Sequence, residues 1–110
     1  MNEDYTHLWI FLCDKEHAYK LTYDNNTVLI HNNDIISLKF IDTNIIELIY
    51  YYNPKEFNAP NTLNCNKNYF VIEDRKLNIT YKYSIKDWYF RQDKEKNMPV
   101  VKVILNQINK

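Results

Sequence analysis

The clearest pattern in the chain is a strict alternation of apolar and polar residues over positions 77–86. Successive side chains of a β-strand point to opposite faces of a sheet, so this alternation predicts a strand with one face in the core and the other in water. The phase then changes, since Trp88 and Phe90 occupy the even positions. Such a change within an extended segment predicts a β-bulge or turn near Lys86 and Asp87.

Further segments of strand composition are separated by short clusters of asparagine and aspartate. Those clusters are typical of turns, and the apolar runs between them have the length of strands. The mixed-charge run 91–97 predicts a solvated hairpin, and the last apolar run, 100–108, fits either a β-branched strand or one face of a helix. The other strands that we expect cover residues 6–13, 17–23, 27–31, 35–41, 45–52, 69–73 and 88–91.

Short strands at this regular spacing predict a mainly β protein, an antiparallel β-sandwich or barrel of about eight short strands. A C-terminal helix at 100–108 is the alternative for the last segment. We expect a single domain spanning 1–110, because a chain of this length commonly folds around one core. Residues 53–68 contain two prolines and follow neither a helical nor an alternating period, which predicts a long irregular loop.

Glycine is absent from the chain, whereas asparagine occurs sixteen times. Turns that need a positive φ must therefore use asparagine or aspartate, which tolerate that conformation next best. The abundance of asparagine, isoleucine, lysine and tyrosine is also typical of adenine- and thymine-rich codons. It indicates an AT-rich genome or a mobile element such as a phage or virus.

Fourteen basic and fourteen acidic residues cancel, so the chain lacks the positive field that gathers phosphates, and we do not expect nucleic acid as a partner. No apolar run approaches the roughly 20 residues that cross a bilayer, and the acidic N-terminal stretch does not resemble a signal peptide. We therefore expect a cytoplasmic protein with no membrane partner. Cys13 and Cys65 form at most one disulfide, and the sequence leaves open whether they pair.

Three consecutive tyrosines end the apolar run 45–52. On a strand, Tyr50 and Tyr52 share the face of Ile46, whereas Tyr51 points to the opposite face. One face must enter the core, and the other must meet a second layer, a partner or water. Ten tyrosines, five phenylalanines and two tryptophans are more than a core of this size usually needs. Because tyrosine is enriched in protein interfaces, we expect some of these rings to contact a partner.

One pair of an acidic and a basic residue is a candidate metal-dependent site. Asp74 and Lys76 follow an apolar strand with the spacing of a magnesium-dependent nuclease, in which the carboxylate binds the metal and the lysine activates water. Such a site would also need an upstream carboxylate such as Asp34 or Asp42. A charged hairpin turn is the simpler interpretation, because this spacing is expected by chance in a chain of this composition.

A second polar cluster surrounds the first predicted turn, where Cys13, Asp14, Glu16 and His17 lie close to His7 in sequence. No CxxC or HxxxH spacing supports a zinc site, and nothing in the sequence orients a cysteine nucleophile. Without glycine, phosphate-binding loops of the Walker and Rossmann types are excluded. We therefore expect no catalytic residues, no metal and no cofactor, and we do not expect an enzyme.

These observations favour a protein-binding module that acts by occlusion, covering a surface of another protein. The leading hypothesis is an immunity protein that neutralises a cognate bacterial toxin with aromatic anchors and with carboxylates that face the basic residues of the toxin. The alternatives are a phage or viral anti-defence protein, a homo-oligomeric structural subunit and the nuclease described above. The predicted partner-binding residues are Glu47, Tyr51, Glu56, Phe57, Asn58, Glu73, Asp74, Trp88 and Tyr89.

Overall fold

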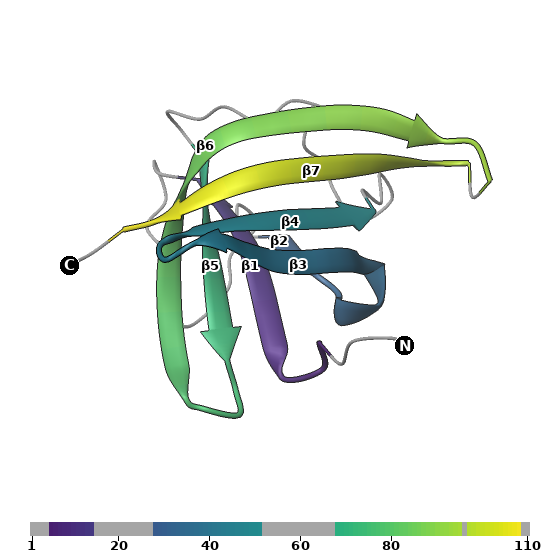
Figure 1. Cartoon of the computed structure of the whole chain (residues 1–110). Coiled ribbons are helices and arrows are strands. Elements are labelled where there is room, and N and C mark those ends of the chain that lie inside the picture. Colours follow the sequence, from purple (N-terminus) through teal and green to yellow (C-terminus); the bar gives the residue numbers. More distant parts are fainter. Residues whose placement is uncertain (1–4, 15–27, 52–67, 96, 109–110) are drawn as a thin grey trace.

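The computed structural model describes residues 5–14, 28–51, 68–95 and 97–108 of the chain. These residues form one seven-stranded antiparallel sheet and a short 3-10 turn (Figure 1). The strands are β1 (Leu8–Asp14), β2 (Val28–Ile30), β3 (Ile35–Asp42), β4 (Ile45–Tyr51), β5 (Asn68–Asp74), β6 (Ile79–Asp93) and β7 (Met98–Gln107), and the turn η1 spans Asn32–Asp34.

The predicted mainly β, antiparallel fold is confirmed, and the C-terminal segment is strand β7 rather than a helix. Residues 79–86 of the predicted strand 77–86 and all of the predicted strand 88–91 belong to the single strand β6, whereas Leu77 and Asn78 lie in the turn before it. A register shift between Ile85 and Asp87 is the predicted bulge. Of the predicted hairpin run 91–97, residues 91–93 end β6, and Lys94, Glu95 and Asn97 lie between β6 and β7. The predicted strand 17–23 lies outside the described residues, as does all of the predicted loop 53–68 except Asn68, which begins β5.

The sheet is curled because of its strand order, β2-β1-β5-β6-β7-β4-β3. Strands β2 and β3 form opposite edges, although only residues 31–34 separate them in the chain. Six strand spacings would hold the edges of a flat sheet about 29 Å apart, whereas the five residue steps from Ile30 to Ile35 span at most about 18 Å. The sheet must therefore bend, and Figure 1 shows it curled into a half-barrel in which β6 turns from the direction of β5 to that of β7.

The core fills the inner, concave face of the curled sheet. Each of the seven strands contributes buried apolar side chains to this face, and the Tyr50 and Phe70 rings meet there edge to face with centroids 6.3 Å apart. Tyr50 is buried beside Ile46 and Tyr51 lies on the opposite face, as the alternation predicts. The buried residues of the inner face are Ile10, Leu12, Ile30, Ile35, Ile46, Leu48, Tyr50, Phe70, Ile72, Tyr83, Ile85, Val101, Val103 and Leu105.

A second, smaller buried cluster lies on the outer face, where Phe11 and Cys13 of β1 pack with Tyr69 and Val71 of β5. Strand β1 lies between β2 and β5 in the sheet. Ile10 and Leu12 of β1 are buried in the inner core, whereas Phe11 and Cys13 are buried in this outer cluster. Both faces of β1 are therefore apolar, which explains why its sequence does not alternate. Cys13 is fully buried in this cluster.

Two hairpins use the same device in place of glycine. Asn78 and Asn97 have φ of 57° and 54°, and they are the non-glycine residues with positive φ in the described part of the chain. Each follows an aspartate by four positions, Asp74 and Asp93, that ends the preceding strand. Each aspartate Oδ1 accepts a hydrogen bond from the backbone N–H two residues later, at 3.0 and 2.9 Å. The prediction that asparagine supplies positive φ is thus confirmed at both turns.

Candidate functional site

Strand β3 forms one edge of the sheet and carries large apolar side chains that face solvent. The exposed fractions are 39% for Ile36, 73% for Phe40 and 56% for Ile41. An edge strand presents backbone N–H and C=O groups that can pair with another chain, and natural proteins usually guard such edges with charged residues or proline. Strand β3 carries the exposed Lys39 in addition to these apolar side chains. An edge that displays this much apolar surface is a candidate site for strand pairing or for docking of a partner.

Part of this edge is already occupied by Tyr5, whose hydroxyl accepts a hydrogen bond of 3.2 Å from the Leu38 backbone N–H. That N–H therefore points away from β4. Because Leu38 and Phe40 keep one register with Leu48 and Ile46 of β4, the Phe40 N–H points the same way. The edge is covered at Leu38 by Tyr5 and presents its backbone to the exterior at Phe40.

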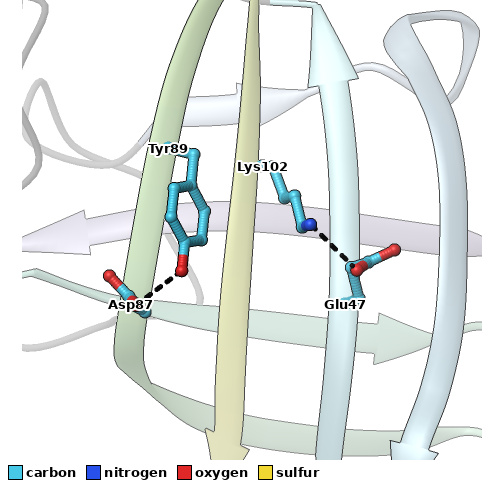
Figure 2. Close-up of polar contacts among 4 residues, drawn as sticks. All are labelled: Glu47, Asp87, Tyr89 and Lys102. Atoms are coloured by element: carbon cyan, nitrogen blue, oxygen red, sulfur yellow. Dashed lines mark hydrogen bonds and ion pairs between the residues drawn. The ribbon is translucent and has the colours of Figure 1, made fainter.

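Four side chains form a polar group on the outer face of β4, β7 and β6, which we call the outer-face group: Glu47, Asp87, Tyr89 and Lys102 (Figure 2). Lys102 Nζ lies 3.4 Å from Glu47 Oε2, and the Tyr89 hydroxyl donates a hydrogen bond of 2.8 Å to Asp87 Oδ2. Lys102 Nζ also lies 5.4 Å from the Tyr89 ring centroid. The hydrogen bond to Asp87 raises the pKa of Tyr89, while the ring stays 52% exposed.

The outer-face group begins one strand away from the exposed edge, because Glu47 pairs with Lys39 of β3. Tyr51 lies on the same face of β4, and its hydroxyl donates a hydrogen bond of 3.1 Å to Asp93 Oδ2. Loss of water around the Tyr51 hydroxyl and then this hydrogen bond raise its pKa. Three of the predicted partner-binding residues, Glu47, Tyr51 and Tyr89, therefore share one face of neighbouring strands.

Glu73 belongs to a separate group at the end of β5. Its Oε1 lies 3.1 Å from the Arg75 guanidinium, which in turn lies 4.1 Å above the Trp9 ring. Trp9 is directly opposite Glu73 in the β1–β5 pair. The structure places this group beside β1, in the other half of the curled sheet from Glu47.

Asp74 and Trp88 face the inner side of the sheet. Trp88 packs against the core, and Asp74 Oδ1 accepts hydrogen bonds of 3.0 Å from the backbone N–H groups of Lys76 and Leu77. The carboxylate therefore closes the hairpin between β5 and β6. Within the described residues, no three His, Cys, Asp or Glu side chains gather where they could hold a metal ion.

Other predicted residues lie outside the described residues. These are Glu56, Phe57 and Asn58 of the predicted partner-binding set, together with Glu16, His17 and Cys65.

A cavity of about 530 Å³ opens at one end of the half-barrel. Side chains from β1, β3, β4, β5, β6 and β7 line it, together with Tyr5, His7 and Leu77. Its rim is apolar, because the lining residues Phe40 and Leu77 are 73% and 61% exposed. The sequence does not predict this cavity, because the alternation of apolar and polar residues shows which side chains face inward but not whether they fill the interior.

Comparison with protein-family models, curated proteins and solved structures finds no match to this chain. Among the described residues there is no helix long and apolar enough to cross a membrane. Exposure, geometry and charge are therefore the grounds for a functional proposal.

Proposed function

We propose that this protein is a protein-binding module that occludes a surface of another protein, with the β3 edge and the outer-face group as its interface. The observation that supports this proposal is the exposure of Ile36, Phe40 and Ile41 on an edge strand. Burying such side chains against a partner removes apolar surface from water, at about 25 cal/mol for each Å². Strand β4 has a neighbour on each side, β3 and β7, whereas β3 ends the order of the described strands. A partner strand would therefore add at β3.

The proposed contact is strand addition, in which an extended segment of the partner pairs with β3. The Phe40 N–H supplies one of the backbone hydrogen bonds, and side chains of the added segment alternate between the two faces. Phe40 faces the cavity side, and Ile41 lies at a register shift between Phe40 and Asp42. Both side chains are exposed and available to the added segment.

The outer-face group supplies the rim of the interface. Glu47 and Lys102 already balance each other's charge, whereas Asp87 accepts a hydrogen bond from the neutral Tyr89 hydroxyl and keeps its negative charge. Charges of this kind steer association and fix the orientation of the partner more than they raise affinity. The half-exposed Tyr89 ring adds an aromatic contact of the type found at binding hot spots.

Within this class we favour a cytoplasmic immunity protein that neutralises a bacterial toxin encoded by an adjacent gene. The support is indirect: small size, balanced charge, asparagine-rich and glycine-free composition, and an exposed apolar edge. A phage or viral anti-defence protein would use the same surface against a different target. A homo-oligomer would use it for β3–β3 pairing between copies.

The test measures binding and inhibition of the polypeptide encoded by the adjacent gene, by isothermal titration and by an assay of its toxicity. Phe40→Glu places a carboxylate at the centre of the proposed contact, and we expect it to weaken binding about 30-fold or more, the loss typical of a hot-spot residue. Lys94→Gln is the matched control, since it makes the same change in net charge at an exposed position of the β6–β7 hairpin.

Equal affinity of wild type and Phe40→Glu for a bound partner would place the interface elsewhere. A wild-type dimer in light scattering that Phe40→Glu dissociates would instead establish the homo-oligomer and remove the occlusion proposal. The same substitution thus separates the two protein-binding hypotheses.

A further inference from the structure

The cavity at the end of the half-barrel has the size of a small-molecule site. Its volume of about 530 Å³ lies within the roughly 300–1,000 Å³ usual for ligand pockets, and the interiors of β-barrels are a preferred location for such pockets. Most of its wall is aliphatic or aromatic, including Leu38, Ile46 and Ile72. An apolar wall of this kind takes up apolar ligands because their transfer from water is favourable.

One polar group of the wall points to a ligand. Tyr83 lines the cavity and is only 4% exposed, yet within the described residues the structure records no hydrogen bond for its hydroxyl. Among the described residues, every fully enclosed side-chain oxygen has a hydrogen-bond partner. Because the Tyr83 oxygen has no recorded partner there, it is not fully enclosed and borders the open space of the cavity. The Tyr83 hydroxyl is therefore available to form a hydrogen bond, which polar groups in buried surroundings normally make, with a molecule that enters the cavity.

The protonation state of Tyr83 fixes what it can recognise. Burial, and then the nearby Tyr81, raise the pKa of Tyr83 above its usual value of 10.0. The hydroxyl is therefore neutral at physiological pH and can donate a hydrogen bond to an acceptor atom of a ligand. The two rings lie 6.4 Å apart at an angle of 48°, so Tyr81 forms an aromatic wall beside the donor.

A charged side chain of the wall, Asp74, limits the ligand further. Asp74 contributes a carboxylate, and one of its oxygens is occupied by the hairpin N–H groups. No lysine or arginine is present among the described residues of the wall. His7 also lines the cavity, but no permanently charged cation among the described residues of the wall balances Asp74. Asp74 would therefore repel a carboxylate or phosphate ligand, whereas it would not repel a neutral ligand.

We propose that this cavity binds one small uncharged molecule, with an apolar or aromatic body and a carbonyl-type oxygen that accepts a hydrogen bond from Tyr83. The cavity shares Leu38 and Phe40 with the proposed interface at β3, and the tests are therefore kept on other strands. The variants that test it are on β5 and β6 and leave Ile36, Phe40 and Ile41 unchanged, so failure of one proposal does not decide the other.

The test compares two probes of similar shape, butyrophenone and butylbenzene, which differ in the ketone oxygen. Each is titrated into ¹⁵N-labelled protein, and affinity is measured from the backbone amide shifts. We expect saturable shifts at Leu38, Ile72 and Tyr83 with both probes. Tyr83→Phe should weaken butyrophenone roughly 2- to 12-fold, the effect of one neutral hydrogen bond, and leave butylbenzene unchanged.

A second variant, Ile72→Phe, adds volume to the wall of the cavity and should abolish binding of both probes. Its folding is checked by amide shift dispersion and thermal unfolding; if it does not fold, Tyr83→Phe decides the outcome alone. Absence of saturable binding by both probes in the wild type would overturn the proposal. Equal weakening of both probes by Tyr83→Phe would overturn the assigned hydrogen bond.

Discussion

The carboxylate of Asp74 closes the β5–β6 hairpin through one oxygen, which accepts two backbone N–H groups at 3.0 Å each. Asp74→Ala removes both hydrogen bonds. Asp74→Asn keeps an acceptor oxygen at the same place but removes the negative charge. Comparing the two variants therefore separates hydrogen bonding in the turn from any role that needs a carboxylate, such as the metal binding required by the nuclease hypothesis.

The expected loss follows from the number of bonds and their exposure. A net hydrogen bond is worth about 0.5–1.5 kcal/mol, and loss of a comparable capping side chain costs about 1 kcal/mol. Because the turn residues are exposed, we expect Asp74→Ala to lower the free energy of unfolding by about 1–2 kcal/mol. An unfolding entropy near 2.1 cal/mol/K per residue converts this to a fall in Tm of about 4–9 °C for a chain of this length. Asp74→Asn should lose less than about 0.5 kcal/mol.

The assay is urea denaturation and calorimetry with and without magnesium. Equal destabilisation by Asp74→Asn and Asp74→Ala would refute the hydrogen-bond interpretation, since the amide oxygen would then fail to replace the carboxylate. A rise in Tm with magnesium in the wild type that Asp74→Asn abolishes would show that Asp74 holds a metal.

Three further predictions concern the turns, the edge and the buried phenol. Asn97→Gly should raise the free energy of unfolding measured in urea and Asn97→Ala should lower it, by up to about 1 kcal/mol each, because φ is 54° there; no difference between them would contradict this. Tyr5→Phe should cost about 1 kcal/mol and speed exchange of the Leu38 amide; unchanged exchange would be evidence against that hydrogen bond. Burial and then Tyr81 raise the pKa of Tyr83 above 10.0, so as pH rises the unfolded chain loses the Tyr83 proton before the folded protein does. The contribution of this proton to stability is therefore present below pH 10 and lost as pH rises through the folded pKa. Tyr83→Phe should therefore flatten the alkaline fall in stability, and an identical fall in both proteins would disprove the shift.

The sequence was informative where one local rule controls the outcome. The alternation over 77–86 identified the strand and its buried face, and the change of phase located the bulge before Asp87. The absence of glycine made asparagine the residue for positive φ, as found at Asn78 and Asn97. The β-branched residues at 100–108 favoured a strand over a helix, because two heavy atoms on Cβ suit a pleated surface.

Features that depend on distant contacts could not be predicted. The apolar run in β5 does not alternate, so nothing in its sequence shows that Asp74 faces inward. Trp88 was selected for its residue type, yet the bulge turns it toward the core. The strand order and the cavity follow from the way that residues 31–34 join opposite edges. Periodicity within single strands carries no information about that closure.

Hydrogen exchange of the β3 amides, measured with and without the bound partner, tests the proposed interface most directly. The Phe40 amide points away from β4 and should exchange rapidly in the isolated protein, then slow at least about tenfold when an added strand accepts its hydrogen bond. The Leu48 amide, on β4 between β3 and β7, should be protected in both states. Rapid exchange at Phe40 in a saturated complex would contradict strand addition at this edge.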